Sequence, residues 1–438
     1  MDAKQIRQLK PMLRRYLKRF DDCFSRKDTR AHMPVYVEGQ LSELKEKSCE
    51  PIALRAGVAP RTLQEFLAQH RWDEDLARRR LQEIVMKDHS GPHSIGLIDE
   101  TSDVKKGTKT PGVQRQWCGT VSATENCIVT VHLGYATGDF HCLLDGELFL
   151  PESWSQDRER CRAAGIPDDM VYRSKWRIAL ELYDRARQCG VSFDWLTFDE
   201  GYGARPGFLQ GVGDRGQLFV AEVPVKFAGW ISPPRVTKRP YRRWTGRPRK
   251  TPRLVRGSRP ASSVRNMLKY SPDLRDQAWV RYRVKEGEKG AIVWDVKHTM
   301  ITMKNQDGLP GQRLHLIVAQ SVLDRNETKF FVSNAPIDTS VQMLLLVAFS
   351  RWRIERCFED QKGEAGLDKW EGRKYLGLKR HLILTSISYL FLAKIRETWR
   401  GGENPELTVC QVHTAVGALI PSWWLNGRAS AKVIVYRK

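Results

Sequence analysis

This 438-residue chain carries 73 Lys and Arg residues against 51 Asp and Glu residues, which gives a formal net charge of +22. Hydrophobic residues make up 41% and charged residues 28%, ordinary proportions that exclude a collagenous, wholly disordered or coiled-coil chain. At about 100–200 residues per domain, the length predicts two to four domains. The excess positive charge favours a polyanionic partner, either nucleic acid or an anionic membrane surface.

Membrane insertion and a bound nucleotide are not expected. The best apolar stretch, residues 381–393, is short and interrupted by polar side chains, whereas a membrane span needs about 20 apolar residues. No apolar segment follows Met1 to form a secretory signal. The nine cysteines are scattered without a C-x-x-C pair, which argues against a disulfide framework or a cysteine zinc site. No G-x-x-x-x-G-K-[ST] motif is present, so we expect no nucleotide cofactor. We expect a cytoplasmic protein.

Residues 1–88 have the periodicity of helices. Apolar side chains recur every three or four positions from Ile6 to Phe20, with basic residues between them. Pro11 predicts a break early in this first helix, because proline removes a main-chain hydrogen bond and clashes with the preceding turn. We therefore expect an N-terminal helical domain.

Residues 50–69 have the pattern of a helix-turn-helix, the two-helix unit that many proteins use to bind DNA. Gly57 supplies the turn, and Pro60 opens the second helix. Recognition helices contact base edges through their N-terminal residues, and here these include Arg61 and Gln64. An ordinary helical hairpin has the same pattern, so both interpretations stay open.

Beyond this region, short apolar runs alternate with helical patterns, which predicts an α/β fold. Residues 94–99 and 193–199 each have the pattern of a buried strand that ends in a carboxylate, Asp99 or Asp199. A helix is expected between them over residues 168–189. Open α/β sheets place their sites at the carboxyl ends of strands. Two carboxylates there suit Mg²⁺, and two ions about 4 Å apart can activate a nucleophile and stabilise the leaving oxygen of a phosphodiester.

A metal site of this kind usually needs a third carboxylate, and Glu355 is our choice. Residues 344–362 are predicted to form one helix, on which Arg351, Glu355 and Lys362 share a face. This face would offer one metal ligand beside two contacts for DNA phosphates. Glu359, one turn further along, is the rival ligand, and a plain surface pair between Arg351 and Glu355 is the alternative interpretation.

Residues 235–259 form a basic arm, with eleven Lys or Arg residues and no acid. Frequent prolines and the high charge predict an extended or disordered segment. Its positive charge predicts that it binds the phosphates of DNA. The DNA-contacting candidates in it are Arg242, Arg243, Trp244, Arg247, Arg249 and Lys250. A merely solvated linker is the alternative. Strands are expected over residues 277–334 and helices over 340–400, followed by a C-terminal tail.

Several short motifs stand out when they are taken together. They are L-I-D-E-T at 97–101, Q-W-C-G-T at 116–120, T-F-D-E-G-Y-G at 197–203, S-N-A-P at 333–336 and R-W-R-I-E-R-C-F-E-D-Q-K at 351–362. In these motifs the chain resembles DDE-type insertion-sequence transposases of the insertion sequence 701 group, which have an RNase H-like core. A related signature, Y-x(2)-R-x(3)-E-x(6)-K, is matched at Arg351, Glu355 and Lys362, whereas Ala348 stands at the tyrosine position.

The resemblance implies a transposase that cuts transposon ends with a metal-activated water and then joins the 3′-hydroxyl to target DNA. Asp99, Asp199 and Glu355 would hold Mg²⁺ or Mn²⁺, as two ions, and Arg351 and Lys362 would contact DNA. The implied partner is double-stranded DNA, both terminal repeats and target, bound by a homodimer in a prokaryotic nucleoid.

The implied fold is an α/β RNase H-like catalytic core with an inserted, mostly β domain and an N-terminal helical DNA-binding domain. The expected segments are 1–88 (helical, DNA-binding), 89–210 (core, first part), 211–335 (inserted β-rich domain with the basic arm), 336–400 (core, helix with the third acid) and 401–438 (tail).

Two alternatives share this fold. One is a catalytically silent or domesticated DNA-binding protein derived from a transposase, and the other is a nuclease that hydrolyses DNA without strand transfer. A membrane-surface protein is less favoured, because the basic arm lacks an apolar face.

Overall fold

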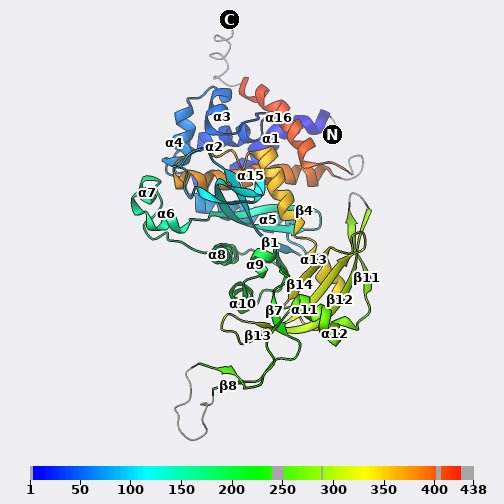
Figure 1. Ribbon diagram of the computed structural model, residues 1–438. Helices are drawn as coiled ribbons and strands as arrows, with labels where there is room; N and C mark the ends of the chain where they lie inside the picture. Colours follow the sequence, from blue (N-terminus) through cyan, green and yellow to red (C-terminus); the bar gives the residue numbers. More distant parts are fainter. Residues whose placement is uncertain (1–2, 239–250, 288–289, 401–405, 426–438) are drawn as a thin grey trace. The chain divides into compact units, whose positions relative to one another are not determined.

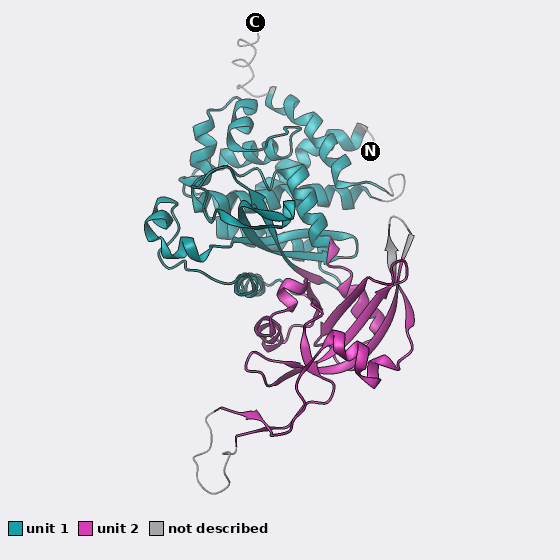
Figure 2. Cartoon of the chain, viewed as in Figure 1, with its two compact units in different colours: residues 1–94, 98–192, 353–438 teal, residues 95–97, 193–352 magenta. Residues whose placement is uncertain are grey.

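The computed structural model describes residues 3–238, 251–287, 290–400 and 406–425 (Figure 1). The chain divides into two compact units, which are coloured separately in Figure 2. Unit 1 comprises residues 1–94, 98–192 and 353–438, and unit 2 comprises residues 95–97 and 193–352.

Unit 1 is mostly helical at both ends of the chain. Its N-terminal helices are α1 (Ala3–Leu17), the 3-10 helix η1 (Lys18–Cys23), α2 (Lys27–Gln40), α3 (Cys49–Ala56), α4 (Pro60–Ala68) and α5 (Glu74–His89). Its later helices are α6 (Glu152–Gln156), α7 (Arg158–Ala163), α8 (Lys175–Gln188), α14 (Trp352–Asp360, which enters unit 1 at its second residue), the π-helix η3 (Gln361–Ala365), α15 (Tyr375–Trp399) and α16 (Val409–Leu425).

A sheet packs beside these helices. β3 (Ala123–Thr137) pairs antiparallel with two strands, β2 (Gln114–Cys118) and β4 (Phe140–Leu148). β1 (Ile95–Val104) is the other neighbour of β3. The division between the units passes through β1, whose first three residues belong to unit 2.

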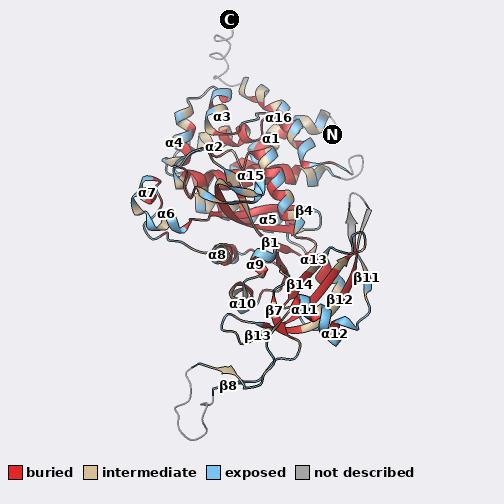
Figure 3. Ribbon diagram, in the orientation of Figure 1, coloured by how far each residue is buried: buried red, intermediate tan, exposed pale blue. Residues whose placement is uncertain are grey.

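Helix α15 is the central helix of unit 1. It contacts β4, α2, α4, α5 and α16, and its side chains are buried along most of its length (Figure 3). A helix that is buried all round needs partners for its polar groups. The amide of Gln40 donates to the Thr385 hydroxyl at 2.9 Å, and the Ser388 hydroxyl donates to the amide oxygen of Gln40 at 2.8 Å. These bonds fix α15 against α2.

Unit 2 is built around a second run of strands. Its strands are β5 (Trp195–Phe198), β6 (Phe219–Val223), β7 (Ala228–Trp230), β8 (Val236–Thr237), β9 (Arg253–Leu254), β10 (Ser262–Ser263), β11 (Val280–Gly287), β12 (Gly290–Lys304), β13 (Pro310–Ser321) and β14 (Thr328–Ser333). The order in the main sheet is β10-β7-β12-β13-β14-β6-β5, with residues 95–97 of β1 beside β5 and with β11 paired to β12. β5 and β6 are parallel, whereas β6, β14, β13 and β12 pair antiparallel in turn.

Short helices complete unit 2. They are α9 (Glu200–Gly203), α10 (Pro206–Asp214), α11 (Val264–Tyr270), α12 (Pro272–Arg275) and α13 (Val341–Ala348). The α/β class with a large mixed sheet therefore agrees with the sequence prediction. Within the described ranges, no helix is both long and apolar enough to cross a membrane.

Several local predictions were wrong, two of them because tertiary packing overrides a local signal. Helix α1 continues through Pro11 without a break, since Leu9 and Leu13 on its inner face are buried. The helix expected from residue 168 starts at Lys175, with Ser174 in an extended conformation at its N-terminus. The segment expected to be a tail contains α16, which packs on α1 and α15.

Candidate active site and DNA-binding residues

Asp199 lies immediately after a fully buried strand, as the sequence predicts. β5 ends at Phe198, and Asp199 caps the N-terminus of α9. Its Oδ1 atom accepts the main-chain N–H groups of Gly201 at 3.0 Å and Tyr202 at 3.3 Å. An aspartate at an N-cap satisfies helix donors and is held in one orientation. The carboxylate is therefore fixed at the carboxyl end of β5.

Asp99 lies in the middle of β1 rather than at its end. The strand continues to Val104, so the expected position at a strand end was wrong. The prediction failed because pairing with a neighbouring strand, which the sequence does not show, carries β1 beyond its apolar run. Asp99 is nevertheless the first residue after the buried run Ile95–Ile98, and its Oδ1 atom accepts the main-chain N–H of Glu100 at 2.7 Å.

The neighbouring Glu100 is engaged by a cation that the sequence analysis missed. The ammonium of Lys175, the first residue of α8, forms a salt bridge with the carboxylate of Glu100. Because side chains alternate along a strand, Asp99 and Glu100 face opposite sides of β1. The choice of Asp99 over Glu100 as the metal ligand stays a prediction. No sequence signal pointed to Lys175, which lies 75 residues from its partner.

Glu355 lies on the exposed face of α14, whereas Ile354, Cys357 and Phe358 form its buried face. Its rival Glu359 is exposed on the same side and forms an ion pair with Arg356 at 3.1 Å. Both carboxylates lie on the exposed side of α14, and the choice of Glu355 over Glu359 as the third acid stays a prediction.

The continuous helix expected over residues 344–362 is interrupted twice. Arg351 lies in the turn between α13 and α14, and Lys362 lies in the π-helix η3. A turn and a π-helix each shift the angular register, so Arg351, Glu355 and Lys362 do not share one regular α-helical face. Within unit 2, the guanidinium of Arg351 lies 3.9 Å from the carboxylate of Glu222.

Lys362 contacts the strand that carries Asp99. Its ammonium donates to the main-chain carbonyl of Ser102 at 3.3 Å and to the hydroxyl of Thr120 at 3.0 Å. Burial lowers the pKa of Lys362. Ser102 follows Asp99 by three residues on β1, a separation of about 10 Å along a strand. Unit 1 thus brings Lys362 to the Asp99 strand.

The three carboxylates offer hard oxygen donors, the ligand type that Mg²⁺ and Mn²⁺ prefer. Asp99 and Glu355 belong to unit 1, and Asp199 belongs to unit 2. Across the part of the chain that the structure describes, no group of three or more His, Cys, Asp or Glu residues is arranged to hold a metal ion. The metal-binding triad stays a prediction.

The expected pair of helices before residue 69 is confirmed as secondary structure. Gly57 ends α3 with a φ of 70°, a left-handed conformation that glycine adopts without strain, and Pro60 begins α4. Arg61 and Gln64 are both exposed, and the Arg61 guanidinium forms an ion pair with Glu65 at 2.6 Å.

The opposite face of α4 is buried through Leu63, Phe66 and Leu67 and packs on α15. The buried Arg380 of α15 donates to the carbonyls of Phe66, Leu67 and His70, which fastens the C-terminal end of α4. The exposed face of α4 is therefore held in a fixed position on unit 1.

The described ends of the basic arm form a short ladder. β8 and β9 pair antiparallel, with Val236 opposite Leu254 and Thr237 opposite Arg253. The six candidate residues of the arm lie outside the described residues; they are Arg242, Arg243, Trp244, Arg247, Arg249 and Lys250.

Comparison with known proteins identifies the family. Residues 19–291, more than half of the chain, match the family described as DDE superfamily endonuclease, and the chain belongs to this family. The chain is also 34% identical over 167 residues to the probable transposase for insertion sequence element IS701 of Microchaete diplosiphon. The aligned stretch covers 38% of this chain and 41% of the relative. The family expected from the sequence motifs is confirmed. The matched range includes Asp99 and Asp199 and ends before Glu355.

Proposed function

We propose that the chain is a DNA transposase, which cleaves DNA at transposon ends and joins those ends to target DNA. The observation that carries the proposal is the family match over a range that includes Asp99 and Asp199, both located where a buried strand segment ends. The similarity to a probable insertion-sequence transposase supports the same reading.

In this proposal Asp99, Asp199 and Glu355 hold two divalent ions, Mg²⁺ or Mn²⁺. Bound there, the ions would supply an activated nucleophile and would stabilise the leaving oxygen of the phosphodiester. The protein's own contribution is orientation. The N-cap bonds hold the Asp199 carboxylate at the end of β5, and the main-chain N–H of Glu100 holds that of Asp99.

The DNA contacts are divided among several elements. The exposed N-terminal half of α4, with Arg61 and Gln64, reads bases of the terminal repeats, and the basic arm at 235–259 neutralises phosphates. Arg351 and Lys362 contact the DNA near the cleaved bond. To contact a phosphate, the ammonium of Lys362 must break one of its hydrogen bonds to Ser102 and Thr120 or contact the phosphate while keeping both.

The proposed organisation follows from these roles. An N-terminal helical domain at residues 1–88 binds the ends, and an RNase H-like core at 89–210 and 336–400 performs the chemistry. An inserted, mostly β domain at 211–335 carries the basic arm. Because each transposon has two ends, we propose a homodimer on the DNA, acting in the nucleoid.

One plasmid assay tests the proposal. The substrate carries the inverted repeats that flank the gene, and the purified chain is incubated with it and with Mg²⁺. Cleavage at the repeats followed by joining to a second plasmid supports a transposase. Cleavage without joining would identify a hydrolytic nuclease, and binding without cleavage would identify a silent DNA-binding protein.

A further inference from the structure

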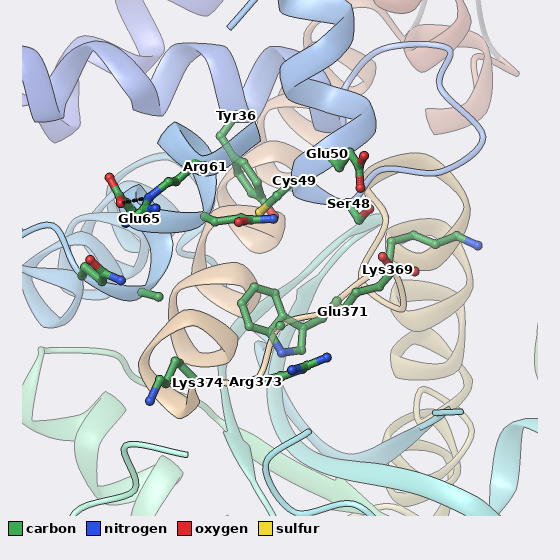
Figure 4. A pocket seen from close by; sticks show the side chains of 15 residues that line it. Tyr36, Ser48, Cys49, Glu50, Arg61, Glu65, Lys369, Glu371, Arg373 and Lys374 are labelled. Carbon is green, nitrogen blue, oxygen red and sulfur yellow. Dashed lines mark hydrogen bonds and ion pairs between the residues drawn. The ribbon is translucent and has the colours of Figure 1, made fainter. Parts of the chain in front are cut away.

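A cavity of about 560 Å³ lies inside unit 1 beside α4 (Figure 4). One wall is formed by the exposed side of α4, with Arg61, Gln64 and Glu65. The facing wall is the segment 369–374, which connects η3 to α15, and Tyr36 and residues 48–50 complete the lining. The residues expected to read bases therefore line a cavity with a second wall.

This second wall is held rigidly. The indole of Trp370 is buried, and the ammonium of Lys105 donates to its main-chain carbonyl. Gly372 is in close contact with the same indole. A Cβ at this position would be 2.0 Å from Cζ2 of Trp370, so no larger residue fits without displacing the ring. A wall that is ordered before binding loses little conformational entropy when a ligand arrives.

Arg373 is the cation of this wall that is available to a ligand. Among the cations that line the cavity, Arg61 is paired with Glu65, Lys369 lies 3.4 Å from Glu46, and Lys374 donates to the carbonyl of Ala163. Arg373 is exposed and has no hydrogen-bond or ion-pair partner among the residues that the structure describes.

The lining also holds three acids, Glu50, Glu65 and Glu371. Glu65 is paired with Arg61, and Glu371 lies on the same segment as Arg373 (Figure 4). The lining has four cations, Arg61, Lys369, Arg373 and Lys374, against these three acids, so its formal charge is +1 and favours an anion.

The size of the cavity determines which part of DNA it can take. A helix is about 10–12 Å wide with its side chains, close to the width of the major groove, about 12 Å. When such a helix enters the groove, the two sugar–phosphate backbones run along its two sides. The volume of the cavity is too small for a duplex, and a strand that runs beside α4 on the side of segment 369–374 would lie in it.

We infer that the cavity is a groove for one DNA strand, in which Arg373 binds a backbone phosphate while Arg61 and Gln64 of α4 reach the bases. The inference rests on the proposed function only in requiring that the chain binds DNA. It assigns a phosphate contact to residues far in sequence from the helix-turn-helix, and it makes segment 369–374 part of the end-binding surface.

The test is a salt titration of binding to one fixed duplex, without Mg²⁺, so that cleavage does not contribute. Arg373→Ala should weaken binding and lower the slope of log affinity against log salt by about 0.9, the value for one phosphate contact. Arg373→Lys should retain the slope. The matched control is Arg79→Ala, an exposed arginine on α5 that does not line the cavity, which should change neither quantity.

A second measurement locates the contact. In a series of duplexes with one neutral methylphosphonate each, a modification at the phosphate in the groove should weaken binding by the native chain and have no further effect on Arg373→Ala. Ala68→Trp, which fills the cavity, should weaken binding to every duplex in the series. Equal salt slopes for the native chain and Arg373→Ala, or identical methylphosphonate profiles, overturn the inference. If the chain cleaves and joins DNA but gives these results, the proposed function stands and only the inferred groove is rejected.

Discussion

The ammonium of Lys47 donates a hydrogen bond to the main-chain carbonyl of Glu364 at 2.7 Å, joining residues 317 positions apart. The same ammonium donates to the carbonyls of Gln40 and Ser42, and it lies 2.9 Å from Nε2 of His413. His413 in turn bonds the Glu364 carboxylate through Nδ1 at 2.6 Å. This cluster ties the loop after α2 and the C-terminal helix α16 to η3, the π-helix that carries Lys362.

Loss of the Lys47 ammonium should destabilise unit 1. Lys47→Met removes the donor to the buried carbonyls of Gln40 and Ser42 and to the partly buried carbonyl of Glu364, and an unsatisfied buried group costs about 1–3 kcal/mol. We expect the free energy of unfolding to fall by about 3 kcal/mol in a denaturant titration. Lys45→Met, at an exposed position two residues away, is the control and should change it by less than about 0.5 kcal/mol. Equal effects of the two variants would show that the cluster does not support the fold.

The buried His381 should make stability depend on pH below neutrality. Burial lowers its pKa to about 4, whereas the hydrogen bond to the carbonyl of Leu367 acts in the opposite direction. Its Nδ1 atom lies 2.9 Å from the hydroxyl of Tyr36. Between pH 6.5 and 4 the unfolded chain binds a proton that the folded chain does not. Stability from this group is therefore complete above pH 6.5 and declines as pH falls toward 4, by about 3 kcal/mol at most.

The matched variant for this effect is His381→Gln, whose amide keeps a hydrogen-bond donor and an acceptor but does not titrate. Its unfolding free energy, measured at intervals from pH 4 to 7, should decline less steeply than that of the native chain. Parallel curves would mean that His381 is not the group responsible.

Removal of any one of the three proposed metal ligands should abolish Mg²⁺-dependent cleavage and leave DNA binding intact. The variants are Asp99→Asn, Asp199→Asn and Glu355→Gln, which keep side-chain size while removing the charge that holds the ion. Asparagine at 199 can still cap α9, so the fold around β5 is retained. Glu359→Gln, which breaks only the pair with Arg356, is the control. Loss of cleavage in Glu359→Gln with activity in Glu355→Gln would move the third ligand by one turn.

Sequence-specific end binding should depend on Arg61 and Gln64. Arg61→Ala and Gln64→Ala should each cost about 1–3 kcal/mol on terminal-repeat DNA and little on scrambled DNA. Glu65 holds the Arg61 guanidinium in the free protein, so Glu65→Ala should release Arg61 and should not weaken binding. Fluorescence anisotropy on the two duplexes measures these effects. Equal losses on both duplexes, or none on either, would refute base reading by α4.

The basic arm should bind phosphates without regard to sequence. Replacement of Arg242, Arg243, Arg247 and Arg249 by alanine removes at most four phosphate contacts, and it should lower the salt slope by up to about 3–4. Affinity should fall alike for terminal-repeat and random DNA. An unchanged slope would identify the arm as a solvated linker.

The amino-acid sequence by itself determined the family, the strand that precedes Asp199 and the helix pair around Gly57. These follow from short-range signals: an apolar run that ends in a polar residue predicts a buried strand, and a glycine followed by a proline predicts a turn between two helices. Such signals depend on neighbours within a few residues and are visible in one chain.

Only the tertiary structure decided which residues engage Asp99, Glu100 and Lys362, and where the helices around Glu355 begin and end. β1 continues past Asp99, α1 continues through Pro11, and α16 forms in a segment expected to be a tail. In each case the free energy of burying apolar surface, or of satisfying main-chain groups, comes from partners distant in sequence, and it exceeds the local preference of about 1–3 kcal/mol that the sequence signals.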